Sequence, residues 1–289
     1  MESQENQYRW PKAEAVYPDR PGRSYALKRL RYRLRAFLHR GLIAQFEQFI
    51  NQHPFLVTLL NEHADYSYPL VYRFLDKRFN RKQRFQAICD NLLFLPEKLT
   101  ALSAPIYKTP LSFGEVMPDF EMTLSMTTHQ PMEGYWVLEL WHKPRNELVY
   151  LLTFAKLGEA LLISVVQGPN FEGSKEMVKQ LTKTCHGLRP AYLMVETMKA
   201  LTKALGFKTL LGIPQKYQNK SRFIQSSHYV VDYDAIFAES GGQLKDYWEL
   251  PLEIDRNLDE VPSKKRSMYR KRYAMLDDLA KVIEEKLEL

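Results

Sequence analysis

The 289-residue sequence lacks any apolar run that approaches the roughly 20 residues of a membrane-spanning helix. Its longest apolar segments, such as 160–166, have the length of buried strands. Residues 1–14 are polar and lack the apolar core of a signal peptide. These absences predict a soluble, cytoplasmic protein, and a peripheral association with the inner membrane is compatible with them.

Cysteine is scarce, with Cys89 and Cys185 as the only two in the chain. They cannot form a multi-ligand zinc site by themselves, and the seven histidines show no metal-ligand spacing. Both cysteines fall within apolar helical patterns, which predicts small buried side chains in a reducing compartment. No metal is expected.

Three sequence fingerprints of common enzyme classes are also missing. The chain has no Walker-type phosphate loop, no Gly-x-Gly-x-x-Gly run and no Gly-x-Ser-x-Gly nucleophile elbow. Hydrolase and metalloenzyme functions therefore have little support. Hydrophobic residues at 45% and aromatic residues at 12% are nevertheless enough for a sizeable core, so a folded globular protein is expected.

Basic charge is abundant and clustered, and the formal net charge is +7. Eight Lys and Arg residues lie within 20–40 without an acid, and six lie within 264–272, again without an acid. A third cluster, 73–84, has six cations and the single acid Asp76. Such clusters favour anionic partners: a phosphate-bearing small molecule, an acidic membrane surface or, ranked below these, nucleic acid.

Helical spacing dominates the first third of the chain. Leucines recur at steps of three and four residues, which predicts an amphipathic helix over 24–39 with one apolar and one arginine-rich face. They are Leu27, Leu30, Leu34 and Leu38. Asn80 is placed to cap a further helix, which Pro96 is expected to end. We interpret residues 1–104 as a helical N-terminal region.

The spacing changes near residue 105. Alternating and then continuous apolar runs predict an antiparallel meander, and two helices followed by an apolar strand at 208–213 predict a crossover to a parallel neighbour. The candidate strands are 120–126, 136–140, 148–155 and 160–166, and the helices are about 174–185 and 190–205. The predicted class is α/β (α+β), with a helical bundle before a mixed, largely antiparallel sheet. Residues 105–255 form its core domain and 256–289 a basic C-terminal helix.

The first candidate site is a corner between two predicted helices, where Gly187, Arg189 and Pro190 meet. Exposed backbone N–H groups and the positive end of a helix attract anions, and a guanidinium can pair with a phosphate through its fork. Gly187 would let the backbone approach a ligand closely. The alternative is a plain turn in which the proline starts the second helix.

A second candidate is Gly168, which follows a buried strand in the run Gln-Gly-Pro-Asn. Ligands of open α/β sheets often bind beyond the carboxyl ends of such strands. The alternative is a simple tight turn.

A third candidate is His228, with Tyr233 and Asp234 close behind it in the sequence. Histidine carries protons near neutral pH, and a carboxylate and a phenol nearby can orient it. The alternative is a structural histidine in a loop.

The fourth candidate is the basic cluster near the C-terminus, where aromatic residues interleave with cations. This pattern suits phosphate backbones or anionic headgroups, and the alternative is a solvated basic face. The cations are Lys264, Lys265, Arg266, Arg270, Lys271 and Arg272. The terminal helix is basic first and acidic later, which opposes the helix dipole unless an anion balances the start.

Several of these motifs occur in an order that resembles the VirK/YbjX family of Gram-negative bacteria. The match runs from about residue 20 to 280 and is strongest over 160–275. The residues that carry it are Gln167, Gly168, the 182–190 corner, the 206–213 strand, His228, Tyr233, Asp234, Gly241, Gly242, Leu250, Pro251 and the basic 262–273 segment. Members form a domain of unknown function, and the resemblance implies a link to virulence and to envelope resistance against antimicrobial peptides.

The order of meander, helices and parallel strand also resembles the acyl-CoA-dependent N-acyltransferase fold. In that fold a pyrophosphate lies at the N-terminus of the helix after the fourth strand. The glycine-rich signature of that helix is absent here, and the nearest equivalent, the 186–190 corner, lies one helix later. This analogy supplies only a hypothesis about function.

Two functions are therefore open. The first is an acyltransferase-like enzyme that acts on an amine of an envelope or small-molecule substrate, with acyl-CoA as donor. Gly168, Gly187 and Arg189 would hold the donor, and His228 or Tyr233 would handle the proton. The second is a non-enzymatic accessory factor whose basic helices bind an anionic membrane or nucleic acid.

Overall fold

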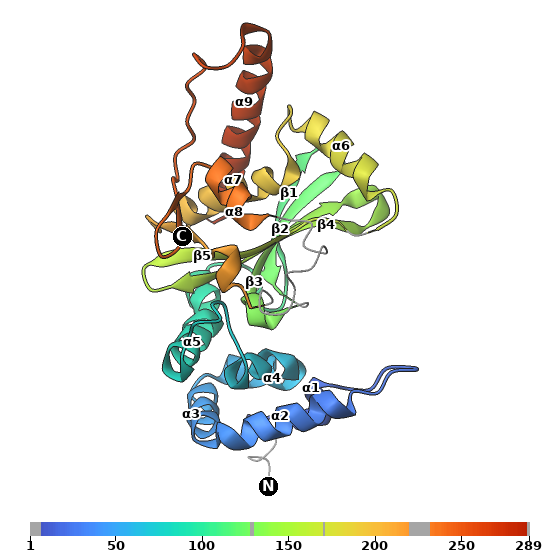
Figure 1. Cartoon of the computed structure of the whole chain (residues 1–289), viewed down its shortest axis with the longest axis vertical. Helices are drawn as coiled ribbons and strands as arrows, with labels where there is room; N and C mark the ends of the chain where they lie inside the picture. The colour runs from blue at the N-terminus through green and yellow to red at the C-terminus, as the bar shows by residue number, and fades with distance from the viewer. Residues whose placement is uncertain (1–6, 128–129, 170, 220–231, 288–289) are drawn as a thin grey trace.

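The computed structural model describes residues 7–127, 130–169, 171–219 and 232–287, and Figure 1 shows their arrangement. An N-terminal group of helices precedes an eight-stranded mixed sheet, and further helices cover the sheet. The predicted α+β class is thus confirmed. The suggested boundary near residue 105 falls between the last of these first helices and the sheet, and the one near 256 falls just before the C-terminal helix.

The described part of the N-terminal region consists of short helices. They are α1 (Ala13–Val16), α2 (Ala26–Leu38), α3 (Arg40–Asn51), α4 (Pro54–Glu62), the 3-10 helix η1 (Ala64–Val71) and α5 (Arg81–Lys98). The predicted cap of α5 is confirmed, because the Asn80 side chain accepts hydrogen bonds from two backbone N–H groups of the first turn. Pro96 does not end α5, because the helix continues to Lys98 and the Leu99 N–H donates to the Leu95 carbonyl oxygen.

The sheet contains the predicted meander as its second to fifth strands, and it begins with a strand at 111–117 that the sequence pattern did not indicate. Its strands lie in the order β1-β2-β3-β4-β5-β6-β8-β7, and among the described strands only β5 and β6 pair in parallel. The chain crosses between these two through α6 (Ser174–Thr184) and α7 (Pro190–Ala204), as predicted. The strands are β1 (Leu111–Met117), β2 (Phe120–Met126), β3 (Trp136–His142), β4 (Glu147–Leu157), β5 (Ala160–Gln167), β6 (Leu210–Gly212), β7 (Gln243–Leu244) and β8 (Trp248–Leu250).

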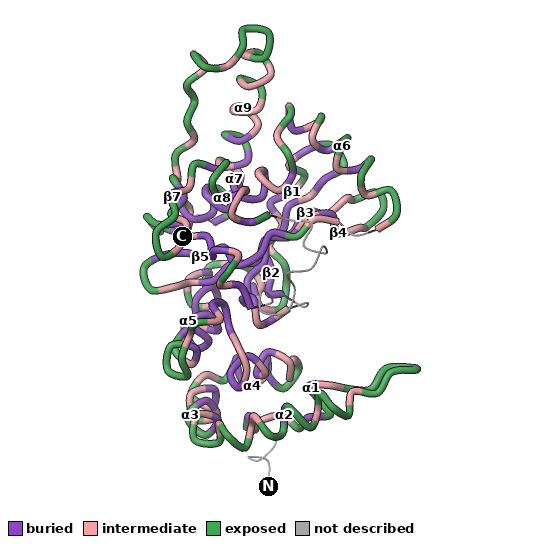
Figure 2. The backbone as a smooth tube through the Cα atoms, in the orientation of Figure 1, coloured by how far each residue is buried: buried purple, intermediate pink, exposed green. Residues whose placement is uncertain are grey.

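Helices cover both faces of the sheet. α5 lies against β4 on the side of the N-terminal helices, and α7 packs across β4 and β5 on the other side (Figure 1). α9 (Ser263–Lys286) packs along α7 and buries Leu276, Leu279 and Ile283. One hydrophobic core extends from the N-terminal helices through the sheet to α9, and Figure 2 shows it as the buried centre of the molecule.

The side-chain amide of Asn91 in α5 pairs with the backbone of β4 at a position that β3 does not reach. The first residue of β3, Trp136, pairs with Phe154, so the backbone of Lys156 lies past the end of that strand. Asn91 Nδ2 donates to the Lys156 carbonyl oxygen at 2.8 Å, and the Lys156 N–H donates to Asn91 Oδ1 at 2.7 Å. The amide replaces a backbone partner and ties α5 to β4.

The helix predicted over 24–39 forms as α2, but its apolar face points to solvent. Tyr32 is the buried residue of this helix, while the leucines that define the pattern are exposed. Amphipathic spacing therefore identified the helix correctly without indicating which face meets the protein.

Candidate functional site

The parallel pair β5 and β6 separates near the middle of β5. Pairing ends where Ile163 lies opposite Gly212, and β5 continues to Gln167 with no described strand on that side. Ligands of α/β sheets bind beyond the carboxyl ends of parallel strands, at a switch in strand order. The segment after β6, 213–219, is therefore the starting point of a candidate site.

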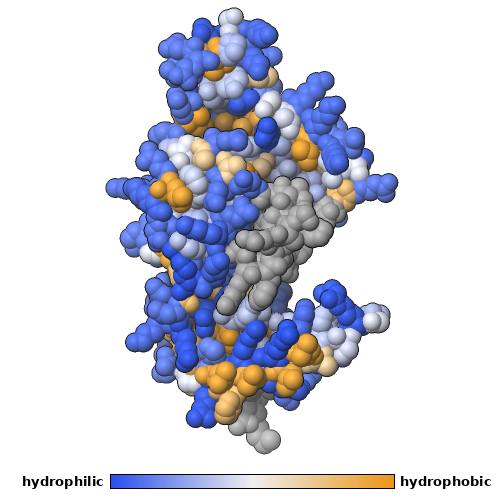
Figure 3. Space-filling model, in the orientation of Figure 1, coloured by the Kyte–Doolittle hydropathy of each residue, from blue (hydrophilic) through white to orange (hydrophobic). Residues whose placement is uncertain are grey.

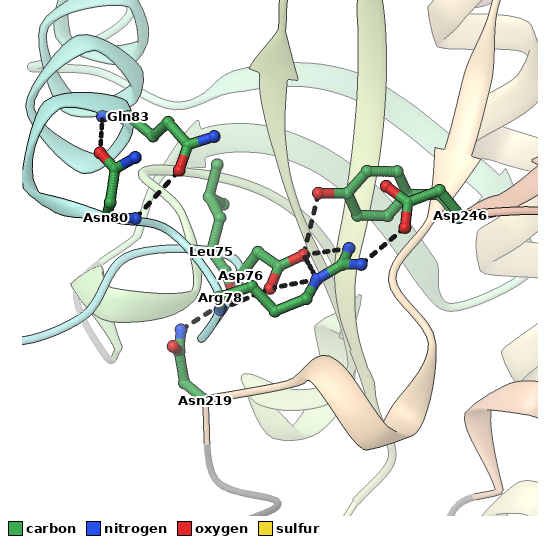
Figure 4. Close-up of polar contacts among 8 residues, drawn as sticks. Leu75, Asp76, Arg78, Asn80, Gln83, Asn219 and Asp246 are labelled. Atoms are coloured by element: carbon green, nitrogen blue, oxygen red, sulfur yellow. Dashed lines mark hydrogen bonds and ion pairs between the residues drawn. The ribbon is translucent and has the colours of Figure 1, made fainter.

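This segment is fastened both to the sheet and to the N-terminal region. Gln218 Nε2 donates to the Ser164 carbonyl oxygen of β5 at 3.2 Å. Asn219 Nδ2 donates to the Leu75 carbonyl oxygen at 3.0 Å, a contact drawn in Figure 4. The Arg73 guanidinium in turn donates to the Asn219 carbonyl oxygen at 2.7 Å.

Asp76 is the centre of a polar network beside this segment (Figure 4). Its carboxylate is fully buried, and it accepts hydrogen bonds from the Arg78 guanidinium at 2.6–3.1 Å and from the Tyr247 hydroxyl at 2.9 Å. Arg78 also donates to Asp246 at 2.6 Å and lies over the Tyr217 ring at 3.6 Å. The network joins the loop after η1, the segment after β6 and the turn before β8.

The side chains of this network are hydrogen-bonded to one another, and these bonds limit their capacity for proton transfer. The hydrogen bond to Asp76 raises the pKa of the Arg78 guanidinium, so it stays charged. Burial raises the pKa of the Tyr247 phenol, so its proton stays on oxygen and is donated to Asp76. The arrangement holds three chain segments together and offers no free acid or base for proton transfer.

Tyr233 and Asp234, two of the predicted catalytic residues, open α8 (Tyr233–Glu239) beside the same segment. Asp234 Oδ1 accepts hydrogen bonds from the Gln215 N–H at 3.1 Å and from Trp248 Nε1 at 2.8 Å. Tyr233 is buried, and its N–H donates to Gln215 Oε1 at 3.2 Å. The third predicted residue, His228, lies outside the described residues.

Gly168 follows β5 directly and lies close to the neighbouring strand. A Cβ at this position would lie 3.1 Å from the Tyr150 ring, so glycine permits the close approach. The next helix, α6, begins at Ser174 after Gly173, whose φ is 79°. The Ser174 N–H donates to the Phe171 carbonyl oxygen at 3.2 Å, and no described side chain caps the other N–H groups of the first turn, which also carries Glu176.

The corner of Gly187 and Arg189 lies at the other end of α6. α7 begins at the predicted proline, and Arg189 is its exposed N-cap residue. Arg272 of α9 donates to the His186 carbonyl oxygen at 2.9 and 3.2 Å, which brings a second guanidinium to Gly187. The 11 residues of α6 span roughly 16 Å, so one phosphate group cannot contact both Gly168 and this corner.

The basic cluster of α9 divides into bonded and exposed cations. Arg266 donates to the carbonyl oxygens of Val261 and Asp259, and Arg272 donates to that of His186. The other four cations are exposed and form no ion pair with any described residue. They are Lys264, Lys265, Arg270 and Lys271. The first turn of α9 holds no acid, so the first of these charges oppose the helix dipole.

The sequence did not indicate the network of Asp76, Arg78 and Tyr247. Tyr247 lies 171 residues from Asp76 along the chain, so no local pattern connects them. The one available signal is that Asp76 is the single acid of the 73–84 basic cluster. A lone acid among cations is well placed to be the buried partner of one of them.

A family model described as "Protein of unknown function (DUF535)" matches residues 21–285. The match includes the helices from α2 onward, the whole sheet and all but the last residue of α9. The chain belongs to the DUF535 family. The resemblance to VirK/YbjX proteins is thereby confirmed, and the DUF535 match covers the N-terminal helices as well as the sheet.

Three relatives of this DUF535 chain come from Gram-negative bacteria. An uncharacterized protein of Haemophilus influenzae is 80% identical over 98% of this chain and 97% of its own length. A Mannheimia haemolytica protein named membrane protein LapB is 65% identical over 75% of this chain and 96% of its own. The uncharacterized protein YbjX of Escherichia coli is 25% identical over 89% and 83%, respectively. No solved structure matches the chain.

The described part of this DUF535 protein contains neither a membrane-spanning helix nor a metal-binding cluster. No helix there has the length and apolar character needed to cross a membrane. No cluster of three His, Cys, Asp or Glu side chains that could hold a metal ion occurs among the same residues. Cys89 and Cys185 are buried as predicted, and burial raises the pKa of each thiol to about 12, so both stay protonated at neutral pH.

Proposed function

We propose that this DUF535 protein is an acyl-CoA-dependent enzyme of the N-acyltransferase type. The observation that carries the proposal is the β5–β6 pair, which is parallel, joined by crossover helices and separated at its carboxyl end. This pair follows an antiparallel meander, which is the order of elements in the N-acyltransferase fold. A fold analogy supports only a hypothesis about function, so binding of the donor is the test.

The N-terminus of α6 is the first place for the donor phosphates, because α6 is the helix that follows β5. The helix dipole and the first-turn N–H groups after Ser174, which no described side chain caps, favour an anion, and Gly168 and Gly173 let the backbone approach one. The corner of Gly187 and Arg189 is the second place, since Arg189 and Arg272 both lie there.

In the proposed reaction, an amine nitrogen attacks the thioester carbonyl carbon, the C–S bond breaks and CoA leaves as a thiolate. The amine proton passes to a base, for which the sequence suggests His228 or Tyr233. The acceptor would be an amine of the cell envelope or of a small molecule. An envelope acceptor agrees with the virulence and envelope link that the VirK/YbjX resemblance implies.

The first prediction is a rise in the midpoint of thermal unfolding with an acyl-CoA. Melts are run with acetyl-CoA, a long-chain acyl-CoA and free CoA. A ligand that binds only the folded state stabilises by about 2.7 kcal/mol at a hundredfold excess over its Kd, which corresponds to about 5 °C. A rise with an acyl-CoA supports the transferase, and no shift with any of the three ligands contradicts it.

Two variants distinguish the two places for the phosphates. Ser174→Glu adds a carboxylate to the first turn of α6, where it repels phosphate but suits the helix dipole, so the unliganded midpoint should not fall. Arg189→Ala removes the exposed guanidinium from the other corner. We expect Ser174→Glu to abolish the acyl-CoA shift and Arg189→Ala to preserve it. The reverse result would assign the donor to the Gly187–Arg189 corner.

A second candidate function is an accessory role in which α9 binds an anionic partner. The four exposed cations on α9 favour it, because an anion at the start of this helix would offset their conflict with the dipole. Nucleic acid and an acidic membrane both have the required charge. The Mannheimia haemolytica relative is named a membrane protein, which gives the acidic membrane additional support.

The second prediction is that α9 dominates the binding of a polyanion, with heparin as the probe. Replacing Lys264, Lys265 and Lys271 by Gln should weaken binding about tenfold at low salt and reduce its dependence on salt concentration. The matched control replaces three other exposed lysines by Gln, which changes the net charge equally. These are Lys108, Lys179 and Lys183. Equal losses in the two variants would show a general charge effect and contradict a specific role of α9.

A further inference from the structure

Large apolar side chains are exposed almost only on α2. Of the six large hydrophobic side chains exposed among the described residues, five lie on this helix, and each is 59–65% exposed. They are Leu27, Leu30, Leu34, Phe37 and Leu38, which we call the apolar stripe. Figure 3 shows hydrophobic surface at the lower end of the molecule, where Figure 1 places α2. A contiguous apolar patch of this kind marks a docking surface.

The apolar stripe cannot turn inward, because the opposite face of α2 is fastened to the protein. Tyr32 is buried, stacks on Trp10 with ring centroids 6.0 Å apart, and donates to the Pro11 carbonyl oxygen at 2.9 Å. Arg29 forms a two-pronged ion pair with Asp19 at 2.7 and 3.0 Å. Because successive helical residues are rotated by about 100°, Tyr32 and Arg29 lie on the side away from the stripe.

Cations border the apolar stripe on both sides. With a rotation of about 100° per residue, Arg31 and Lys28 follow one edge of the stripe and Arg33 follows the other. Arg31 and Lys28 are exposed and form no ion pair with any described residue, while Arg33 makes a surface pair with Glu14. The whole segment 20–46 contains no Asp or Glu.

We propose that α2 lies on a bilayer surface rich in anionic lipid, with the apolar stripe inserted among the acyl chains just below the headgroups. Interfacial helices have this composition, with Leu and Phe on one face and Lys and Arg beside it. The long basic side chains can reach the lipid phosphates while their stems cover apolar surface. The 13 residues of α2 span about 20 Å, which suits a helix in the plane of the membrane.

The charge pattern argues against other occupants of the apolar stripe. Two copies joined stripe to stripe would bring the unpaired cations Lys28 and Arg31 of both copies together, and segment 20–46 supplies no acid to offset them, which opposes association. A nucleic acid would match the cations but would leave the apolar side chains without apolar contacts. Anionic lipid satisfies both the apolar stripe and its cations.

This surface is separate from α9 and from the proposed transferase site. Figure 1 places α2 near one end of the longest axis and the N-terminus of α9 at the other. A flat bilayer that contacts α2 therefore leaves the exposed cations of α9 in water. The inference does not rest on acyl transfer, and it is tested without acyl-CoA.

The third prediction concerns flotation of the full chain with vesicles of phosphatidylcholine alone or with about a third phosphatidylglycerol. The parent protein should bind the anionic vesicles preferentially. The triple variant Leu30→Ser, Leu34→Ser and Phe37→Ser should lose at least about tenfold of that binding, because three inserted side chains become polar. Its unfolding midpoint should not fall, since all three are exposed. Leu244→Ser, which changes an exposed leucine of β7, is the matched control and should bind like the parent.

A labelled cysteine checks insertion directly. The two native thiols are buried, so an environment-sensitive dye will react with an introduced cysteine. Leu34→Cys should give a blue shift when anionic vesicles are added, and Leu244→Cys should not.

Several results would overturn the inference. They are unchanged vesicle binding by the triple variant, equal binding of the parent to neutral and anionic vesicles, or no spectral shift at Leu34→Cys. Vesicle binding that is lost with the α9 lysines would assign the membrane contact to α9 instead. A parent that ignores vesicles but forms a dimer lost in the triple variant would assign the apolar stripe to a second copy of the chain.

Discussion

Replacing Arg78 by methionine is expected to destabilise the protein by about 3–5 kcal/mol, the usual cost of breaking a buried ion pair. The Asp76 carboxylate is fully buried, and among the described residues it would keep only the Tyr247 hydroxyl and one backbone N–H as partners. Methionine retains part of the packing on the Tyr217 ring, so the lost stability comes mainly from the unpaired charge. Urea unfolding followed by circular dichroism measures the effect.

The same substitution at an exposed pair is the control. Arg256 pairs with Asp277 on the surface, where both side chains are 52% exposed, so Arg256→Met should cost less than about 1 kcal/mol. Adding Asp76→Asn to Arg78→Met removes the stranded charge, so the double variant should be more stable than Arg78→Met alone. A similar small loss for Arg78→Met and Arg256→Met would show that the network does not hold the segments together.

The meander and its crossover were predictable because local apolar spacing and the length of the links between strands determine both. Alternating apolar residues at 136–140 mark a strand, and the continuous run at 160–166 marks a strand covered on both faces. Short links force antiparallel neighbours, and two intervening helices force a parallel one. The structure follows this order from β2 to β6.

The direction in which α2 faces was not predictable from the same kind of pattern. A leucine at every third or fourth position defines a face of a helix but not what that face contacts. Tyr32, Arg29 and Ala36 form the side of α2 that faces the protein. The stacking of Tyr32 and the ion pair of Arg29 hold this side inward, so the leucines stay exposed. Those partners, Trp10 and Asp19, lie in the segment before α2, where no sequence pattern predicts their contact with the helix.

Of the candidate site, the sequence predicted only where the flanking strand and helix end and begin. Glycine and proline correctly marked the end of β5 at Gly168 and the start of α7 at Pro190. Their positions in space depend on α6, which separates them, and on Arg272, which reaches the corner from 86 residues away. The catalytic roles of His228, Tyr233 and Asp234 stay predictions.

Replacing Asn91 by leucine is expected to cost about 2–4 kcal/mol, although the new side chain has a similar size and a higher helix propensity. Asn91 is fully buried, and its amide pairs with both backbone groups of Lys156, which lies beyond the first residue of β3. Leucine would leave that N–H and that carbonyl oxygen without partners beneath α5. The loss is therefore in the attachment of α5 to the sheet and not in α5 itself.

Gln86→Leu separates this attachment from the helix that carries it. Gln86 lies on the exposed side of α5 and bonds only to the nearby Asp90 among the described side chains, so its replacement should change stability by no more than about 0.5 kcal/mol. Amide hydrogen exchange at Lys156 should accelerate in Asn91→Leu and stay unchanged in Gln86→Leu. If Lys156 exchanges equally slowly in both variants, apolar packing of α5 on β4 is sufficient to hold the helical region on the sheet, and the amide only fills the place that β3 leaves.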